Sequence, residues 1–295
     1  MELRLFPLRF FMEARERIAF PEGRPENVLR GAFGMEFRRI ACVPECEGVS
    51  TCEQRERCAY ARMFEPGAVF GEPSGFANWP RPFVFRARGL DGRVVRAGEG
   101  FEFDVHLFEM KSPAAAYLAL AFARMGRAAV REVRMVRESG EAGEVLGDGS
   151  APMVLGLEGA ARVERVVVRF VTPTELKSGQ RVVERPEFGV LAGRIRDRVS
   201  KLRELYDAGA LEMDFQGFGE RAAGVRLERW EARRVEAVRR SGRTGQVHSL
   251  GGFVGEAEYV GELGEFVPWL KAARWTGVGR QTVWGKGELE VMKVQ

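Results

Sequence analysis

A glycine-rich segment near the end of the chain, residues 277–287, has the residue types of an anion-binding loop. Its sequence, GVGRQTVWGKG, places glycines on both sides of Arg280 and Lys286. Glycine lets backbone N–H groups approach a ligand closely, and the two cations suit a phosphate. The segment therefore predicts a loop that binds a phosphate-bearing partner, although an ordinary glycine-rich turn has the same composition.

The residues that follow this loop exclude the common mononucleotide-binding motifs. In P-loop and dinucleotide-binding folds, a helix begins directly after the glycines, and its N-terminus meets the phosphate. Here only residues 288–295 follow, and Leu289 and Val291 alternate with polar residues, which predicts a closing strand. A loop with cations in this position fits an extended polyanion better than a mononucleotide.

A run of arginines within residues 226–243 forms a second basic region, with Trp230 inside it and only Glu228, Glu231 and Glu236 to oppose the charge. The arginines are Arg226, Arg229, Arg233, Arg234, Arg239, Arg240 and Arg243. Clustered arginine is the usual electrostatic signature of nucleic-acid binding, whereas a solvated charged face is the alternative interpretation. If single-stranded phosphates are bound here, affinity should fall with salt by about 0.7 log units per contact per decade.

The chain has two histidines, and histidine is the natural general base near neutral pH. His248 lies between Arg243 and the turn at Gly251–Gly252, within the more basic second half of the chain. His106 alternates with acidic residues in a predicted strand. We expect His248 to be the better catalytic candidate, and a structural histidine is the alternative for both.

All four cysteines, Cys42, Cys46, Cys52 and Cys58, fall in one loop, residues 42–58, with the spacing C-x3-C-x5-C-x5-C. In a reducing compartment, clustered thiols favour a metal over disulfides, and four thiolates suit a closed tetrahedral zinc site. The spacing lacks the C-x2-C unit of common zinc sites. A structural zinc ion is therefore the leading hypothesis, with an iron–sulfur centre, free thiols or disulfides as alternatives.

Length and composition indicate a folded, soluble protein. The chain has 295 residues, of which 45% are hydrophobic, with a net charge of +4 and a pI near 9.0. The charged N-terminus does not resemble a signal peptide, and no stretch approaches the ~20 uncharged residues that span a bilayer. We expect a cytoplasmic protein without membrane contacts.

The apolar patterns predict two halves with the same order of elements. In the first half, strands are expected at residues 3–10, 82–87, 101–108 and 130–136, with a break in phase at Pro7, and helices at 28–40 and 112–125. In the second half, strands are expected at 163–171, 247–259 and 288–295, helices at 188–206 and 262–273, and residues 225–240 fit either state. The sequence thus predicts an α+β protein with two tandem ferredoxin-like (βαββαβ) domains, residues 1–158 with the cysteine-rich insertion and residues 159–295 with the glycine-rich loop.

Several motifs together resemble the RAMP superfamily, and within it the CRISPR-associated endoribonuclease that processes repeat RNA. They are the loop at 277–287, VRFVTPT at 168–174, LGGFVG at 250–255, LRGAFG at 29–34, the cysteine loop and YARMFE at 60–65. The resemblance implies a metal-independent enzyme that cuts precursor CRISPR RNA once and gives a mature guide RNA. The ribose 2′-OH would attack its own phosphate and leave a 2′,3′-cyclic end, which needs a base, an acid and a cation for the developing charge.

This resemblance assigns roles to residues already singled out. His248 and Lys286 are the catalytic candidates. Because the helix at 28–40 contains no histidine, where the family often has one, Tyr60 or a lysine could take the place of the base. The predicted RNA-binding residues are Arg234, Arg239, Arg240, Arg243, Gly277, Gly279, Arg280, Gln281, Thr282, Gly285, Lys286 and Gly287.

Two other functions remain open at this point. The first is a non-catalytic RAMP-type subunit that holds guide RNA within a CRISPR effector complex, alongside other subunits. The second is a protein-interaction module stapled by the cysteine loop. Cleavage of a repeat RNA, binding without cleavage, or neither would separate the three hypotheses.

Overall fold

The computed structural model describes residues 1–43, 45–73, 78–111, 114–159, 162–240 and 247–295, except for the side chains of residues 238–240 and 247–249. The chain forms two compact units. The N-terminal unit comprises Arg4–Met153 and Lys201–Gly209. The C-terminal unit comprises Met1–Leu3, Val154–Ser200 and Ala210–Gln295.

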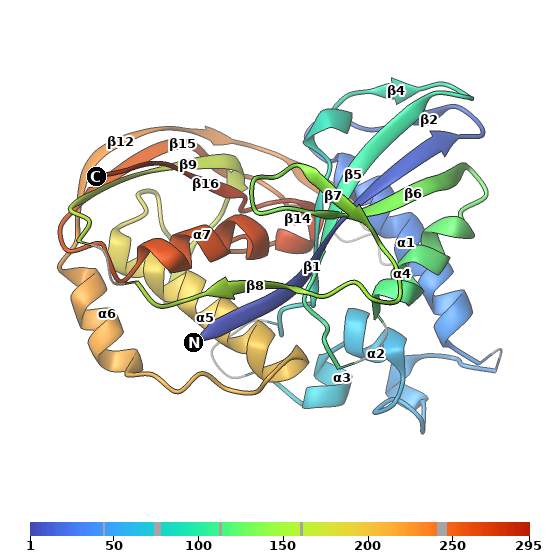
Figure 1. Cartoon of the computed structure of the whole chain (residues 1–295), viewed down its shortest axis with the longest axis horizontal. Helices are drawn as coiled ribbons and strands as arrows, with labels where there is room; N and C mark the ends of the chain where they lie inside the picture. The colour runs from blue at the N-terminus through green and yellow to red at the C-terminus, as the bar shows by residue number, and fades with distance from the viewer. Residues whose placement is uncertain (44, 74–77, 112–113, 160–161, 241–246) are drawn as a thin grey trace. The chain divides into compact units, whose positions relative to one another are not determined.

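The N-terminal unit is built on an antiparallel sheet with strand order β3-β5-β1-β6-β7. Helices α1 and α4 cover one face of this sheet (Figure 1). The elements of this part of the chain are β1 (Glu2–Ala14), β2 (Ile18–Ala19), α1 (Pro25–Ala41), η1 (Val49–Thr51), α2 (Ala59–Phe64), α3 (Gly67–Phe70), β3 (Phe83–Arg86), η2 (Arg88–Leu90), β4 (Val94–Val95), β5 (Gly100–Leu107), α4 (Ala114–Ala123), β6 (Ala128–Val136) and β7 (Ala142–Val145).

Strand β1 shows the expected change of phase at Pro7. Leu3 and Leu5 are buried before the proline, and Leu8 and Phe10 are buried after it, so the inward-facing positions change from odd to even numbers. Since successive side chains of a strand point to opposite faces, the chain must rotate locally at this point. The prediction of a first strand with a phase break is therefore confirmed.

Phenylalanine side chains fill the core of the N-terminal unit. The ring of Phe33, on α1, lies 5.2 to 6.0 Å, centroid to centroid, from five other phenylalanine rings. These are Phe37, Phe64, Phe83, Phe85 and Phe122. Each large aromatic ring buries much apolar surface, and pairs in tilted or edge contact add about 0.5–1.5 kcal/mol beyond that burial. This cluster joins α1, α2, α4 and the sheet.

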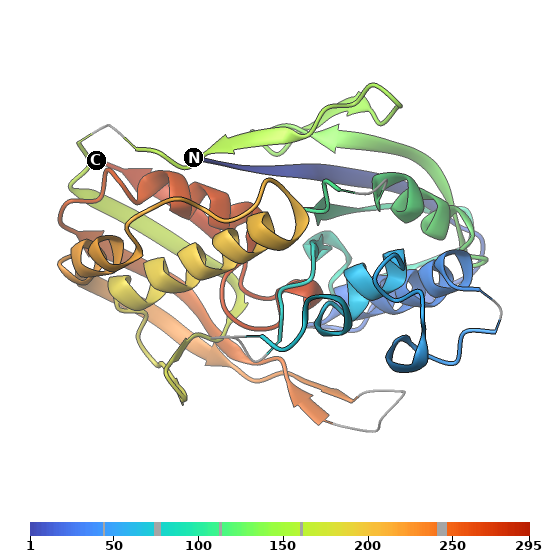
Figure 2. The same cartoon turned by 90° about the horizontal axis from the view of Figure 1, so that it is seen from below.

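The C-terminal unit contains a second antiparallel sheet, with strand order β12-β15-β9-β16. Helices α5 and α7 lie against one face of it (Figures 1 and 2). The elements of this part of the chain are β8 (Met153–Gly156), β9 (Arg165–Thr174), β10 (Lys177–Ser178), β11 (Arg181–Val182), α5 (Phe188–Tyr206), α6 (Phe215–Ala223), β12 (Arg226–Val235), β13 (Val238–Arg240), β14 (Val247–Ser249), β15 (Gly252–Val260), α7 (Val267–Thr276), η3 (Thr282–Trp284) and β16 (Leu289–Val294).

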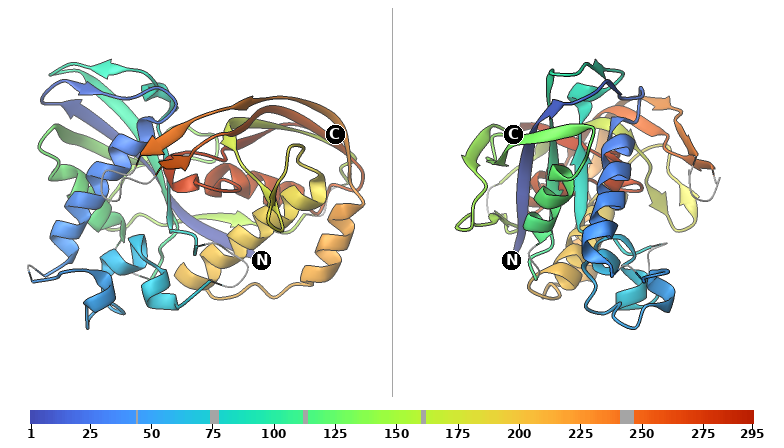
Figure 3. Two further views of the ribbon diagram at one scale, coloured as in Figure 1. Left: turned by 180° about the vertical axis from the view of Figure 1, so that it is seen from behind. Right: turned by 90° about the vertical axis from the view of Figure 1, so that its right-hand side faces the viewer.

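Two short hairpins extend from the C-terminal unit. One is β10–β11, between β9 and α5, and the other is β13–β14, which continues from the ends of β12 and β15. Both project on the same side of the unit, the first drawn in olive and the second in orange (Figures 2 and 3).

The mixture of helices with antiparallel sheets confirms the predicted α+β class. The helix expected at 188–206 is confirmed as α5, and the ambiguous residues 225–240 form strands β12 and β13. The last helix was expected at 262–273, but α7 begins at Val267, with Pro268 in its first turn. Helix α6 was not expected, although the Asp214 carboxylate caps it by accepting the Gly217 N–H.

None of the helices in the described ranges combines the length and the apolar character that a membrane-crossing helix needs.

Candidate nucleic-acid interface

The glycine-rich loop connects α7 to β16 and is bonded to the end of β9. Its base closes where the Val278 N–H donates to the Gly287 carbonyl, at 2.8 Å. The Gly287 N–H donates to Pro173 (3.1 Å), and the Arg280 N–H donates to Glu175 (3.0 Å). The loop is therefore fixed by main-chain hydrogen bonds to the segment that ends β9.

The glycines of this loop allow close approach of the chain's own backbone. Gly279 and Gly287 have φ angles of +78° and +69°, a region that favours glycine. A Cβ atom at Gly279 would overlap the carbonyl oxygen of Glu175, and one at Gly287 would overlap that of Val278. The sequence interpretation assigned these glycines to the approach of a ligand, whereas here they serve internal packing.

Gln281 carries backbone strain within the same loop. With φ at +66°, it is the one non-glycine residue of the described chain in the left-handed region. A side chain in this region costs about 1–2 kcal/mol. Such strain is often found at functional sites. The predicted RNA-binding residues Thr282 and Gly285 follow within one turn, in η3 and at its C-terminal end.

The two cations of the loop differ in exposure. Arg280 is about half exposed, and its Nη1 lies 2.5 Å from Oε1 of Glu175. Lys286 is buried, with 5% of its surface exposed. Arg280 can therefore reach a phosphate directly, whereas Lys286 would need the loop to open or the substrate to enter it.

Arginines along β12 form ion pairs with glutamates two residues further on. The pairs are Arg226 with Glu228, Arg229 with Glu231, and Arg234 with Glu236. In a strand, residues i and i+2 lie on the same face, which brings each pair together. The run is therefore closer to neutral than its arginine count suggests.

Arg233 is the one β12 arginine with no acidic partner recorded in the described part of the chain. It is exposed. Exposed ion pairs are worth only about 0.2–1 kcal/mol, so a phosphate can displace the glutamates beside the other arginines.

His248 lies in β14, where its main chain is in register with Arg239 of β13. The neighbouring Arg240 is in register with Val247. The side chains of these residues, and the whole of Arg243, lie outside the described residues. The next residues along the chain, Leu250 to Gly252, pass close to the ends of β12 and β9.

Strand register brings several predicted residues to one end of the C-terminal sheet. Arg234 is opposite Phe253, and Phe253 is opposite Thr174, one residue before Glu175. The glycine-rich loop is bonded to the same end of β9. We call this region the loop end of the sheet: residues 172–176, 234–236, 250–253 and 277–288.

Neither alternative to His248 has the surroundings of a general base. His106 is buried in β5, opposite Pro7 and Val84. Tyr60 stacks on Phe64, and its pKa is raised above the usual value, first by burial and then by the charge of Glu65, against the lowering effect of two arginines. A raised pKa leaves less phenolate near neutral pH, which opposes a base role.

Within the cysteine loop, Cys42 lies within electrostatic reach of Cys46 and Cys58. The pKa of Cys42 is raised to about 12, first by burial and then by the charges of Cys58 and Cys46. None of the four cysteines forms a disulfide. Within the described residues, no three metal-ligating side chains already form a set that could hold an ion.

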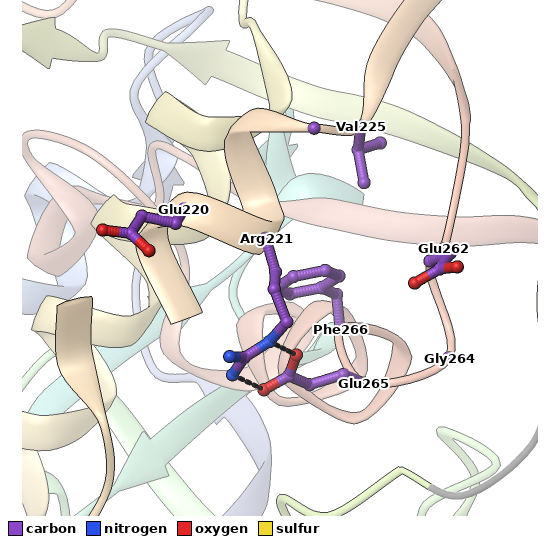
Figure 4. Close-up of a pocket in the computed structure, with 8 residues that line it drawn as sticks. Glu220, Arg221, Val225, Glu262, Gly264, Glu265 and Phe266 are labelled. Atoms are coloured by element: carbon purple, nitrogen blue, oxygen red, sulfur yellow. Dashed lines mark hydrogen bonds and ion pairs between the residues drawn. The ribbon is translucent and has the colours of Figure 1, made fainter. Parts of the chain in front are cut away.

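A separate pocket of about 400 Å³ lies in the C-terminal unit, between the end of α6 and the segment that precedes α7. Its polar lining is mainly acidic, from Glu220, Glu262 and Glu265. Arg221 spans part of it and pairs with Glu265 through two contacts, at 2.7 and 2.8 Å (Figure 4). An acidic pocket does not attract a nucleic-acid backbone, so the loop end remains the better candidate.

Two family models match the chain, one in each half. Residues 168–289 match the family model described as CRISPR-associated endoribonuclease Cas6, and this segment contains β12, His248 and the glycine-rich loop. This segment is thus similar to a Cas6 endoribonuclease domain. Residues 3–145 match a family model described as an N-terminal domain. The resemblance to a CRISPR-associated endoribonuclease is thus confirmed. A comparison with curated proteins gives no match.

Solved structures of Cas6 proteins share the fold along nearly the whole chain. Thermus thermophilus Cas6 (TTHB231) is 16% identical, with a TM-score of 0.57 and 98% of each chain covered. The product complex of a Cas6 called TTHA0078 is 20% identical, with a TM-score of 0.54, covering 99% of this chain and 100% of the other. A partial Cas6-RT-Cas1–Cas2 complex is 11% identical, with a TM-score of 0.58, and 46% of its chain is covered.

Sequence reasoning missed one residue at the loop end. Glu175 contacts the loop through both its main chain and its carboxylate, yet it was not singled out. It directly follows the VRFVTPT motif, and an acidic residue there gives no signal of contact with a loop about a hundred positions later.

Proposed function

We propose that this protein binds CRISPR repeat RNA and cleaves it once to give mature guide RNA. The observation that carries the proposal is the match of residues 168–289 to the Cas6 family model, because the matched segment holds the loop end and its cations. Similar Cas6 chains are known as product and substrate-mimic complexes. We also propose that the protein acts in the cytoplasm.

The proposed chemistry is an attack of the ribose 2′-OH on the adjacent phosphate, without a metal ion. The bond from phosphorus to the 2′-oxygen forms and the bond to the 5′-oxygen breaks, which leaves a 2′,3′-cyclic phosphate and a 5′-OH once the departing oxygen has taken up a proton. His248 would accept the proton of the 2′-OH, and a well-placed general base contributes about 10²–10⁴-fold. Arg280 and Lys286 would stabilise the charge that develops on the phosphate oxygens. The predicted RNA-binding residues at and near the loop end, from Arg234 to Gly287, would hold the strand.

We also propose that each half is a ferredoxin-like domain. In both sheets the first strand lies between the third and the last, and the second strand lies outside the third: β3-β5-β1-β6 and β12-β15-β9-β16. Each sheet has two helices, one after its first strand and one before its last. This order is what the βαββαβ pattern requires.

The test is cleavage of a labelled CRISPR repeat RNA in the presence of EDTA. We expect a single cut, a product with a 2′,3′-cyclic phosphate, and no cleavage of a repeat with a 2′-deoxy substitution at the cut position. His248→Ala should slow single-turnover cleavage by about 10²–10⁴-fold while RNA affinity is retained. Wild-type rates for His248→Ala would remove this residue from the mechanism, and dependence on added Mg²⁺ would contradict the metal-free reaction.

A second candidate function is a subunit that holds guide RNA without cutting it. The observation that favours it is the absence of histidine from α1 (Pro25–Ala41), together with the burial of Lys286. The same assay separates the two functions, because a binder would shift the repeat RNA in a gel and leave it intact.

We further propose that Cys42, Cys46, Cys52 and Cys58 hold a structural zinc ion that pins residues 42–58. The charges of Cys58 and Cys46 act on Cys42, and this loop has little core of its own, with Val49 its one buried hydrophobic residue among those described. Metal analysis of purified protein should find about one zinc per chain, and Cys52→Ser should lower the amount. Four titratable thiols and no zinc would contradict the proposal.

A further inference from the structure

Glu175 joins the end of β9 to the glycine-rich loop through three features. Its carbonyl oxygen accepts a hydrogen bond from the N–H of Arg280 at 3.0 Å, and its carboxylate Oε1 accepts one from Nη1 of Arg280 at 2.5 Å. The same carbonyl lies where a Cβ atom at Gly279 would be. Main chain and side chain of one residue therefore fix both the position of Arg280 and the direction of its guanidinium group.

The carboxylate of Glu175 also acts on a second arginine of the loop end. The pKa of Arg234 is raised, first by its hydrogen bond and charge contact with Glu236, and then by the charges of Glu175 and Glu184. Strand register places the main chain of Arg234 two strands away from Thr174, the residue before Glu175, with Phe253 of β15 between them. Glu175 thus lies within electrostatic reach of two predicted RNA-binding arginines.

Exposure differs between the partners. The Glu175 side chain is 10% exposed, whereas that of Arg280 is 49% exposed. A carboxylate so nearly buried is costly unless it is paired, so Glu175 keeps a guanidinium beside it. The recorded side-chain contact of Arg280 uses Nη1, and a guanidinium has five N–H donors in a rigid plane. Arg280 can therefore stay bonded to Glu175 while its other donors meet a phosphate.

We propose that Glu175 is a positioning residue for RNA binding, which orients Arg280 so that it and Arg234 address the same stretch of the phosphate backbone. This inference rests on the proposed function. Glu175 itself would not contact the RNA, because its charge would repel a phosphate. The positioning role accounts for an acidic residue within a basic site. Pre-orienting a long side chain reduces the ordering cost that binding otherwise carries.

The experiment is a double-mutant cycle on Glu175→Gln and Arg280→Ala, read as affinity for a fluorescent, uncleavable CRISPR repeat RNA. Glutamine keeps the size of the side chain and an acceptor oxygen but removes the charge. In the native background, Arg280→Ala should weaken binding by about 10-fold. In the Glu175→Gln background, Arg280→Ala should weaken RNA binding by less than about 3-fold, because an Arg280 that is not held in place contributes less to affinity.

Each outcome has a defined meaning. Equal losses in the two backgrounds would overturn the positioning role while leaving RNA binding at the loop end intact. If Arg280→Ala leaves affinity unchanged in the native background, both the proposed RNA site and the positioning role of Glu175 are contradicted.

Glu265→Gln is the matched control, since it removes the carboxylate of another Arg–Glu pair in the same unit, and should leave affinity unchanged. Thermal unfolding of every variant identifies losses of affinity that come from misfolding. Gly279→Ala displaces the loop from Glu175, so in that background Arg280→Ala should also weaken RNA binding by less than it does in the native protein.

Discussion

The connection between the last helix and the last strand differs sharply between the two units. In the N-terminal unit, residues 124–127 alone link α4 to β6, whereas in the C-terminal unit residues 277–288 link α7 to β16. Four strands of each sheet follow the same order, β3-β5-β1-β6 and β12-β15-β9-β16. The same core order thus carries a plain turn in one unit and a strained, charged, glycine-rich loop in the other, so the proposed RNA site includes this connection in the C-terminal unit only.

The largest effect is expected from the core of the N-terminal unit. Phe33→Ala should lower stability by about 3–5 kcal/mol, because it empties the centre of the phenylalanine cluster. Chemical denaturation monitored by circular dichroism measures this loss. Met35→Ala, at a site 62% exposed on the same helix, is the control and should have little effect. If Phe33→Ala also reduced the RNA affinity of the molecules that remain folded, the N-terminal unit would contribute to RNA binding, and the contrast between the two units would not hold.

A pair of glycine substitutions tests the two connections directly. Gly287→Ala should destabilise the protein by about 2–5 kcal/mol, since the new Cβ overlaps the Val278 carbonyl at a positive φ. Gly126→Ala in the short connection has no neighbour within 4 Å and no positive φ, so its stability should stay near that of the native protein. Melting temperatures of the two variants make the comparison, and similar shifts would show that the long loop is no more constrained than the short turn.

Strain at Gln281 gives a smaller effect of opposite sign. Gln281→Gly should stabilise the protein by about 1 kcal/mol, because glycine adopts the left-handed region without strain. If the side chain contributes to binding, RNA affinity should fall in the same variant. A gain in stability with unchanged affinity would assign the strain to packing alone, and denaturant midpoints together with binding titrations distinguish these results.

The smallest effect is expected at the acidic pocket of the C-terminal unit. Arg221→Ala removes an exposed ion pair with Glu265 and should cost only about 0.2–1 kcal/mol. RNA affinity should not change, because the pocket lies outside the loop end. A clear loss of affinity, measured by fluorescence anisotropy, would extend the RNA-binding surface to this pocket.

Much of the frame could be predicted from the sequence because apolar periodicity determines it. Helix α5 follows from apolar residues at three- and four-residue spacing, and the phase break in β1 follows from the pattern around Pro7. Residues 225–240 contain a signal that favours a strand. Arg and Glu two positions apart recur along β12, and such pairs meet in a strand but not in a helix.

The loop end was less predictable, for a physical reason. Arg280 and the glycines stand out by residue type, but the partner that fixes them, Glu175, is distant in sequence, and its carbonyl oxygen gives no signature in the side-chain pattern. The role of Gly279 and Gly287 in backbone packing depends on the same long-range contact. Whether these residues bind RNA, and whether the cysteines bind zinc, stay predictions.

The glutamates that accompany the arginines affect how ionic strength would act on complex formation. When a phosphate replaces Glu236 beside Arg234, the nucleic acid releases a bound cation, but the displaced carboxylate gathers one from solution. Net ion release is then smaller than a tally of guanidinium groups implies. A plot of log affinity against log salt concentration should therefore be shallower than the number of arginines at the interface would give. The difference between the two slopes would give the number of displaced carboxylates.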